Sequence, residues 1–137
     1  MKNVNVWWLL AAVAMAAIAA LHIVGGGAEL ARPLLNQKVL GAAVTFNLYY
    51  AWHLVSVMLV AMALAYGAAA FSASHRSLGS AASLLALAFA VLNIVIGLQA
   101  GLYPWGLPQW VLFAPVAAVG FLGLFASPSV GRRAVPS

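Results

Sequence analysis

The chain has 137 residues, of which 66% are hydrophobic and 5% are charged. This composition excludes a soluble fold, for which about half apolar and about one quarter charged is typical. The net charge of +5 arises from six Lys and Arg residues against one acid, Glu29, and it suits contact with the lipid bilayer and its anionic headgroups rather than with nucleic acid.

Four apolar segments predict four transmembrane helices, in chain order at about residues 6–24, 45–71, 80–102 and 109–126. Each approaches the roughly 20 residues needed to cross a ~30 Å hydrocarbon core. Backbone groups in lipid must be satisfied within their own segment, which favours helices. We therefore predict an all-α, integral membrane four-helix bundle that forms a single transmembrane domain over 1–137.

The end of the first helix is marked by His22, three glycines and Glu29. If the helix continued through the glycines, Glu29 would lie seven residues from His22 and share its face. The glycines also fit an unwound helix end that lets another group approach closely. A third interpretation is an ordinary capped C-terminus, with His22 near the negative end of the helix dipole.

The connection over residues 25–41 is long and carries Arg32, Pro33 and Lys38. We expect a short interfacial turn of helix at residues 29–32, which Pro33 limits.

The second helix begins with a polar cluster. His53 shares a face with Tyr49, Tyr50 and Ser56, at spacings of three and four residues, and Asn47 lies further out. The rest of this helix is mostly Ala, Leu, Val and Met. The plain interpretation of the cluster is an interfacial aromatic belt with one hydrogen-bonded histidine.

The third and fourth helices carry fewer candidates. We expect the amides of Asn93 and Gln99 to form hydrogen bonds between helices, with a cavity lining as the alternative. Gly97 and Gly101 form a G-x-x-x-G step that suits close helix approach. Pro115 lies one turn into the fourth helix and is expected to bend it.

The distribution of Lys and Arg predicts the orientation, because cytoplasmic loops carry the excess of positive residues. One side holds four of these residues and the other holds two: Lys2, Arg76, Arg132 and Arg133 against Arg32 and Lys38. We predict a multi-pass protein of the bacterial inner (plasma) membrane with cytoplasmic N- and C-termini. The long first loop and both histidines then lie towards the outer surface.

Antiparallel first and second helices would bring His22 and His53 to similar depth. Ionisable side chains in a bilayer are costly, which makes this pair a functional candidate. Three uses stay open: axial ligation of a b-type haem, binding of a divalent metal together with Glu29, and binding of a small polar molecule or headgroup, or proton relay. The predicted ligand-binding residues are His22, Glu29, Asn47, Tyr49, Tyr50 and His53, with His22 and His53 as the metal ligands.

Three segments together resemble a pattern in small four-helix bacterial inner-membrane proteins with no established activity. The segments are His22 through Glu29, Arg32-Pro33-Leu34-Leu35, and Tyr50-Ala51-Trp52-His53. The resemblance covers about the first half of the chain. It implies that the two histidines, Glu29 and the Arg-Pro-Leu-Leu turn work together.

We therefore expect a small polytopic membrane protein whose His/Glu/Tyr cluster near the outer leaflet binds a metal, haem or small ligand. One alternative is a non-catalytic accessory subunit that forms a homo-oligomer or joins a larger membrane complex. Another is a membrane enzyme or transporter that uses the histidine pair as a proton relay. The chain has no cysteine and one acid, so catalysis would rest on histidine, tyrosine or a bound cofactor. These absences favour a protein that is not an enzyme without deciding the point.

Overall fold

The computed structural model describes residues 4–126, which form helices and no strand. The all-helical class is thus confirmed, with four main helices, three of them long and apolar. The elements in chain order are α1 (Val6–Leu21), the π-helix η1 (His22–Ala31), α2 (Arg32–Asn36), α3 (Ala42–Phe71), the short 3-10 helix η2 (Ala73–His75), α4 (Arg76–Gln99) and α5 (Trp110–Phe125).

Three continuous helical segments are long and apolar enough to cross a membrane: Val6–Asn36, Ala42–Phe71 and Ala73–Gln99. The fourth apolar helix, α5, is shorter, at 16 residues. This arrangement indicates a membrane protein.

The first helix does not end at Val24, where the sequence analysis placed its end. It continues through the glycines as η1 and then as α2, to Asn36. A π-helix closes its hydrogen bonds five residues on rather than four, and such segments often occur at functional sites. Pro33 lies in the first turn of α2, where a missing N–H is tolerated. The expected long loop is therefore reduced to residues 37–41.

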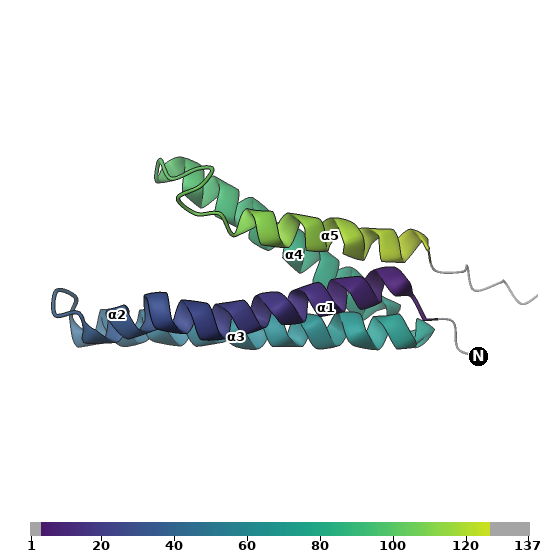
Figure 1. The fold of residues 1–137 in the computed structure, drawn as a ribbon, viewed down its shortest axis with the longest axis horizontal. Coiled ribbons are helices and arrows are strands. Elements are labelled where there is room, and N and C mark those ends of the chain that lie inside the picture. Colours follow the sequence, from purple (N-terminus) through teal and green to yellow (C-terminus); the bar gives the residue numbers. More distant parts are fainter. Residues whose placement is uncertain (1–3, 127–137) are drawn as a thin grey trace, which may run out of the picture.

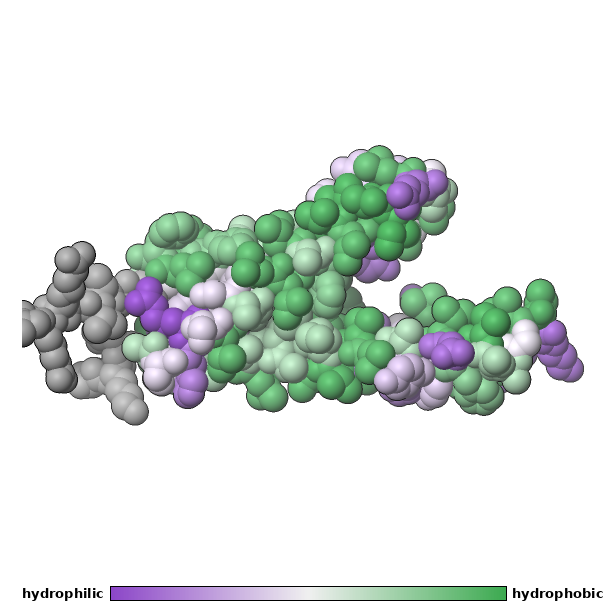
Figure 2. Space-filling model, turned by 180° about the vertical axis from the view of Figure 1, so that it is seen from behind, coloured by the Kyte–Doolittle hydropathy of each residue, from purple (hydrophilic) through white to green (hydrophobic). Residues whose placement is uncertain are grey.

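The helices form two hairpins, and Figure 1 shows how they are arranged. In one hairpin α1, η1 and α2 run antiparallel to α3, and in the other α4 runs antiparallel to α5. The hairpins meet at the closed end, where α1 begins and α5 ends, and they diverge towards the open end, where α2 lies. Figure 2 shows the notch between the two arms and an outer surface that is mostly hydrophobic.

The hydrophobic core lies towards the closed end because small residues there let the helices approach closely. On α5, a Cβ atom added at Gly123 would lie 2.5 Å from the indole of Trp8. On α4, a Cβ atom at Gly79 would lie 2.8 Å from the same indole. The buried residues of α4 are all small: Gly79, Ala82, Ser83, Ala86, Ala90 and Gly97. This stripe of small residues is the kind of surface on which membrane helices pack.

Side-chain donors from other helices bind the carbonyl groups at the end of α5. Trp8 Nε1 donates to the Gly120 carbonyl at 2.9 Å, and Asn5 Nδ2 donates to the Gly123 carbonyl at 2.8 Å. Arg76 donates to the Leu124 carbonyl at 3.2 Å. The last carbonyls of a helix have no partner within it, so the bonds to Gly123 and Leu124 satisfy groups that would be costly in an apolar environment. Gly120 lies further inside α5, where the bond from Trp8 joins α1 to α5.

At the open end, Asn93 joins α4 to the start of α5. Its Nδ2 donates to Gln109 Oε1 at 2.9 Å, and its Oδ1 accepts from the Trp110 backbone N–H at 3.1 Å. The expected hydrogen bond between helices is therefore present at Asn93. Gly101 lies in the turn after α4 with φ +68°, so that it serves the turn rather than a helix contact.

Candidate functional site

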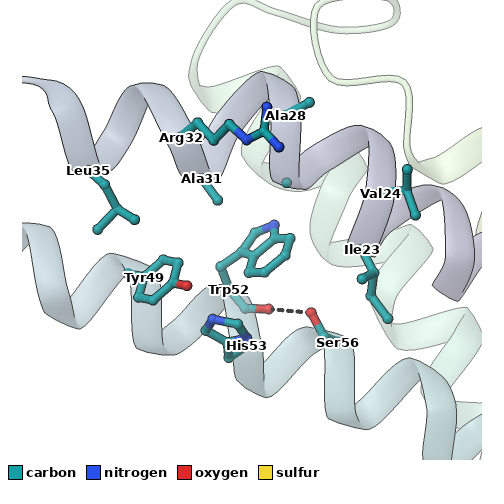
Figure 3. Close-up of a pocket in the computed structure, with 11 residues that line it drawn as sticks. Ile23, Val24, Ala28, Ala31, Arg32, Leu35, Tyr49, Trp52, His53 and Ser56 are labelled. Carbon is teal, nitrogen blue, oxygen red and sulfur yellow. Dashed lines mark hydrogen bonds between the residues drawn. The ribbon is translucent and has the colours of Figure 1, made fainter.

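A pocket of about 520 Å³ lies between η1–α2 and α3, in the part of the first hairpin that extends towards the open end. Figure 3 shows its walls: η1 and α2 on one side, α3 on the other. The lining residues are Ile23, Val24, Gly27, Ala28, Ala31, Arg32, Leu35, Tyr49, Trp52, His53 and Ser56. Most of this lining is apolar or aromatic, with a few polar groups, as is usual in small-molecule sites.

The glycines of η1 make room for Trp52. A Cβ atom added at Gly26 would lie 3.5 Å from Trp52 Nε1, and one at Gly27 would lie 3.8 Å from the indole ring. A methyl group at Gly26 would therefore stand in van der Waals contact with the indole, which leaves little room for a side chain longer than that of alanine. Of the interpretations considered for these glycines, the structure shows the close approach of another group, with the helix kept intact rather than unwound.

Trp52 is the centre of an aromatic cluster that includes both histidines. The His22 ring stacks on the indole with ring centroids 5.0 Å apart and an angle of 21°. The His53 ring meets the indole edge-on at 4.9 Å, and Tyr49 meets His53 edge-on at 4.5 Å. Offset and edge-on ring pairs of this kind are each worth about 0.5–1.5 kcal/mol.

His22 is engaged with the backbone of α3. Its Nε2 lies 3.4 Å from the Trp52 carbonyl oxygen, which also accepts from Ser56 Oγ at 3.1 Å. Because a carbonyl only accepts, this contact requires the tautomer that carries hydrogen on Nε2. His22 is not among the pocket-lining residues. A metal or haem iron at this nitrogen would have to displace the contact.

His53, unlike His22, is a pocket-lining residue. Its side chain is exposed rather than packed into the core. Figure 3 shows its ring beside Trp52, on the same side of α3 as Tyr49 and Ser56. Of the two histidines, His53 is therefore the one that a bound molecule would meet.

Besides His22, three of the predicted site residues lie outside the pocket lining: Glu29, Asn47 and Tyr50. Glu29 is exposed, because a turn of π-helix holds more residues than a turn of α-helix, and residues seven apart no longer share a face. Asn47 Nδ2 donates to the Ala43 carbonyl of its own helix at 2.9 Å. Tyr50 is 62% exposed.

The same geometry bears on metal binding. Within residues 4–126, no three or more His, Cys, Asp or Glu side chains lie close enough together to hold a metal ion. A site built from His22, His53 and Glu29 is thus not assembled.

Trp52 and Arg32 were not among the predicted ligand-binding residues, although the resemblance included both and implied that the turn beginning at Arg32 works with the histidines. Trp52 Nε1 is buried and has no hydrogen-bond acceptor in the part of the chain that the structure describes. Arg32 lines the pocket, and its side chain runs back along η1 towards Ala28 (Figure 3). One sequence signal was available for Trp52, namely a large aromatic residue beside His53 opposite three consecutive glycines.

Comparison of the chain with protein-family models, with curated proteins and with solved structures finds no match.

Proposed function

We propose that the protein binds a small amphiphilic molecule in the pocket between η1–α2 and α3. The observation that carries this proposal is the lining itself. Aliphatic residues and an indole line the pocket together with four residues that carry polar groups: Arg32, Tyr49, His53 and Ser56. Such a combination suits a ligand with an apolar body and one polar end.

We further propose that the helices span the bacterial inner membrane with the open end outward and both termini in the cytoplasm. The excess of Lys and Arg at the closed end and in the termini supports this orientation. In this orientation His53 lies roughly 27 Å along α3 from Phe71, at 1.5 Å per residue. In a hydrocarbon core of ~30 Å, that is close to the outer interface.

The test is a binding titration with a matched pair of variants. A dansyl-labelled fatty acid is added to the purified full-length protein in detergent, and energy transfer from tryptophan to the dansyl group is recorded. The pocket variant is Val24→Phe/Ala28→Phe, which changes two exposed lining residues of η1. The control is Val13→Phe/Ala17→Phe, which makes the same exchange at exposed positions of α1 outside the pocket lining.

We expect saturable binding by the wild type and by the control variant, and binding at least roughly tenfold weaker in the pocket variant, equivalent to about 1.4 kcal/mol. Equal affinity of the wild type, the pocket variant and the control variant would show that the fatty acid does not bind in this pocket. Absence of binding by the wild type would contradict the proposal as a whole.

A further inference from the structure

The pocket extends along α3 from Tyr49, towards the open end, to Ser56. Tyr49 lies roughly 33 Å from Phe71 and Ser56 roughly 23 Å, at 1.5 Å per residue. Figure 3 shows Leu35 of α2 near Tyr49 and Ile23 of η1 near Ser56. With the open end outward, the pocket therefore begins inside a ~30 Å hydrocarbon core and ends in the headgroup region.

The polar groups that line this pocket favour an anion. Arg32 carries the one fixed charge among the lining residues, and no carboxylate lies beside it there. The Tyr49 hydroxyl and the His53 ring add two groups able to donate hydrogen bonds. The planar guanidinium of Arg matches the geometry of phosphate and binds it through two parallel hydrogen bonds.

The pocket is also open to the surroundings of the hairpin. Val24, on its wall, is 74% exposed, and Leu30, on the same helix, is 61% exposed. At this depth an exposed aliphatic surface is in contact with lipid rather than with water. A lipid molecule can therefore enter from the side without leaving the bilayer.

We propose that the ligand is an anionic phospholipid of the outer leaflet, with its phosphate at Arg32 and an acyl chain beside Ile23 and Val24. This inference rests on the proposed function and names its ligand. The phosphate lies at the Arg32 guanidinium, which extends towards Ala28. The chain runs inward along the aliphatic wall.

The experiment uses native mass spectrometry of the full-length protein in detergent. Three probes are titrated: phosphatidylglycerol, a diacylglycerol with the same chains, and inorganic phosphate. Arg32→Gln removes the pocket's charge. Lys38→Gln is the matched control, because Lys38 is an exposed cation on the same side of the predicted topology that does not line the pocket.

We expect one phosphatidylglycerol to bind per chain, with at least roughly tenfold lower affinity in Arg32→Gln and less than roughly a twofold change in Lys38→Gln. Diacylglycerol should bind more weakly than phosphatidylglycerol, and inorganic phosphate should not compete with the lipid.

Several results would overturn the inference. Equal binding of diacylglycerol and phosphatidylglycerol, or equal losses in both charge variants, would show that Arg32 does not hold a phosphate. Competition by inorganic phosphate would point to a free anion instead of a lipid. If these results occur while the pocket variant Val24→Phe/Ala28→Phe still binds the dansyl-labelled fatty acid more weakly than the wild type, the proposed function is supported and only the phospholipid is ruled out as the ligand. If that variant binds every probe as tightly as the wild type, both the proposed function and the phospholipid ligand are ruled out.

Discussion

At the residue scale, the two intramembrane histidines perform different tasks although they contact the same indole. His22 stacks on Trp52 and contacts its carbonyl oxygen, so that it joins η1 to α3. His53 lines the pocket and is exposed. The positions of the two histidines in the sequence predicted that both lie near the same end of their helices. They could not predict which histidine lines the pocket, because that depends on where Trp52 lies between the helices.

This difference predicts opposite effects of two alanine variants. His22→Ala should lower the free energy of unfolding by about 1–2 kcal/mol, through loss of one ring stack and one hydrogen bond, while dansyl-fatty-acid binding is largely kept. His53→Ala should weaken binding with a smaller effect on stability. Denaturant unfolding followed by circular dichroism and the binding titration measure the two quantities. The reverse pattern would show that the assignment is wrong.

Glycines at the closed end should tolerate no added methyl group. Gly123→Ala should cost about 1–3 kcal/mol, since its Cβ would lie 2.5 Å from the Trp8 indole. Gly67→Ala in α3 is the control, because a Cβ atom there meets nothing within 4 Å. Thermal unfolding in detergent gives both values. Equal stability of the two variants would mean that α1 and α5 do not pack as described.

At the scale of the elements, η1 is the segment that defines the pocket. The helix from Val6 to Asn36 is continuous, yet its wider turns at His22–Ala31 move Glu29 away from the histidines and admit Trp52 against Gly26. The apolar residues at about 6–24 predicted the first part of this helix. They could not predict the π-helix, because the glycines permit several backbone conformations, and contact with α3 selects one of them.

The packing of η1 predicts a difference between neighbouring glycines. Gly26→Leu should displace Trp52 and reduce its ring stacking with His22, because the Cβ alone already approaches Nε1 to 3.5 Å. Gly25→Leu should leave Trp52 in place, since a Cβ atom there meets nothing within 4 Å. Near-ultraviolet circular dichroism reports on the indole environment. An unchanged spectrum for Gly26→Leu would contradict the described contact.

At the scale of the whole molecule, the two hairpins have unequal lengths. The 30 residues of α3 extend over roughly 45 Å at 1.5 Å per residue, well beyond a ~30 Å hydrocarbon core. The 16 residues of α5 extend over roughly 24 Å. The tip of the longer hairpin is nevertheless apolar, with Val39, Val44 and Phe46 all exposed. With α3 close to the membrane normal, as the depths given above for Tyr49 and Ser56 require, this tip and the exposed Lys38 beside Val39 lie beyond the hydrocarbon core.

This upright orientation predicts where the tip lies. A nitroxide attached at Val39→Cys should collide more often with a water-soluble nickel chelate than with oxygen dissolved in lipid. The same label at Val57→Cys, an exposed position in the middle of α3, should show the reverse preference. The chain has no native cysteine, so each label is unique. Lipid-like accessibility at Val39→Cys in lipid nanodiscs would show a steeply tilted hairpin and would contradict the depth given for the pocket.

The sequence predicts the helices of this structure better than it predicts the packing between them. Helix number and class depend on backbone satisfaction in lipid, which an apolar run reveals directly. The divergence of the hairpins depends on small residues of α4 and α5 that match Trp8 and Tyr66 on other helices. Such pairings join distant parts of the chain. The sequence of one helix does not show which other helix packs against it. For this reason the sequence analysis predicted neither the divergence of the hairpins nor the pocket.

The bonds at the end of α5 have a consequence for the order of assembly during synthesis. α5 leaves the ribosome after the other helices that the structure describes. Its Gly120, Gly123 and Leu124 carbonyls accept hydrogen bonds from Trp8, Asn5 and Arg76, which were made earlier. Until α5 arrives, the Trp8 indole N–H has no Gly120 carbonyl to meet, and part of the small-residue stripe of α4 faces lipid. The closed end is therefore completed after translation has passed Phe125, so that a nascent chain stopped before Trp110 lacks both the second hairpin and its contacts with α1.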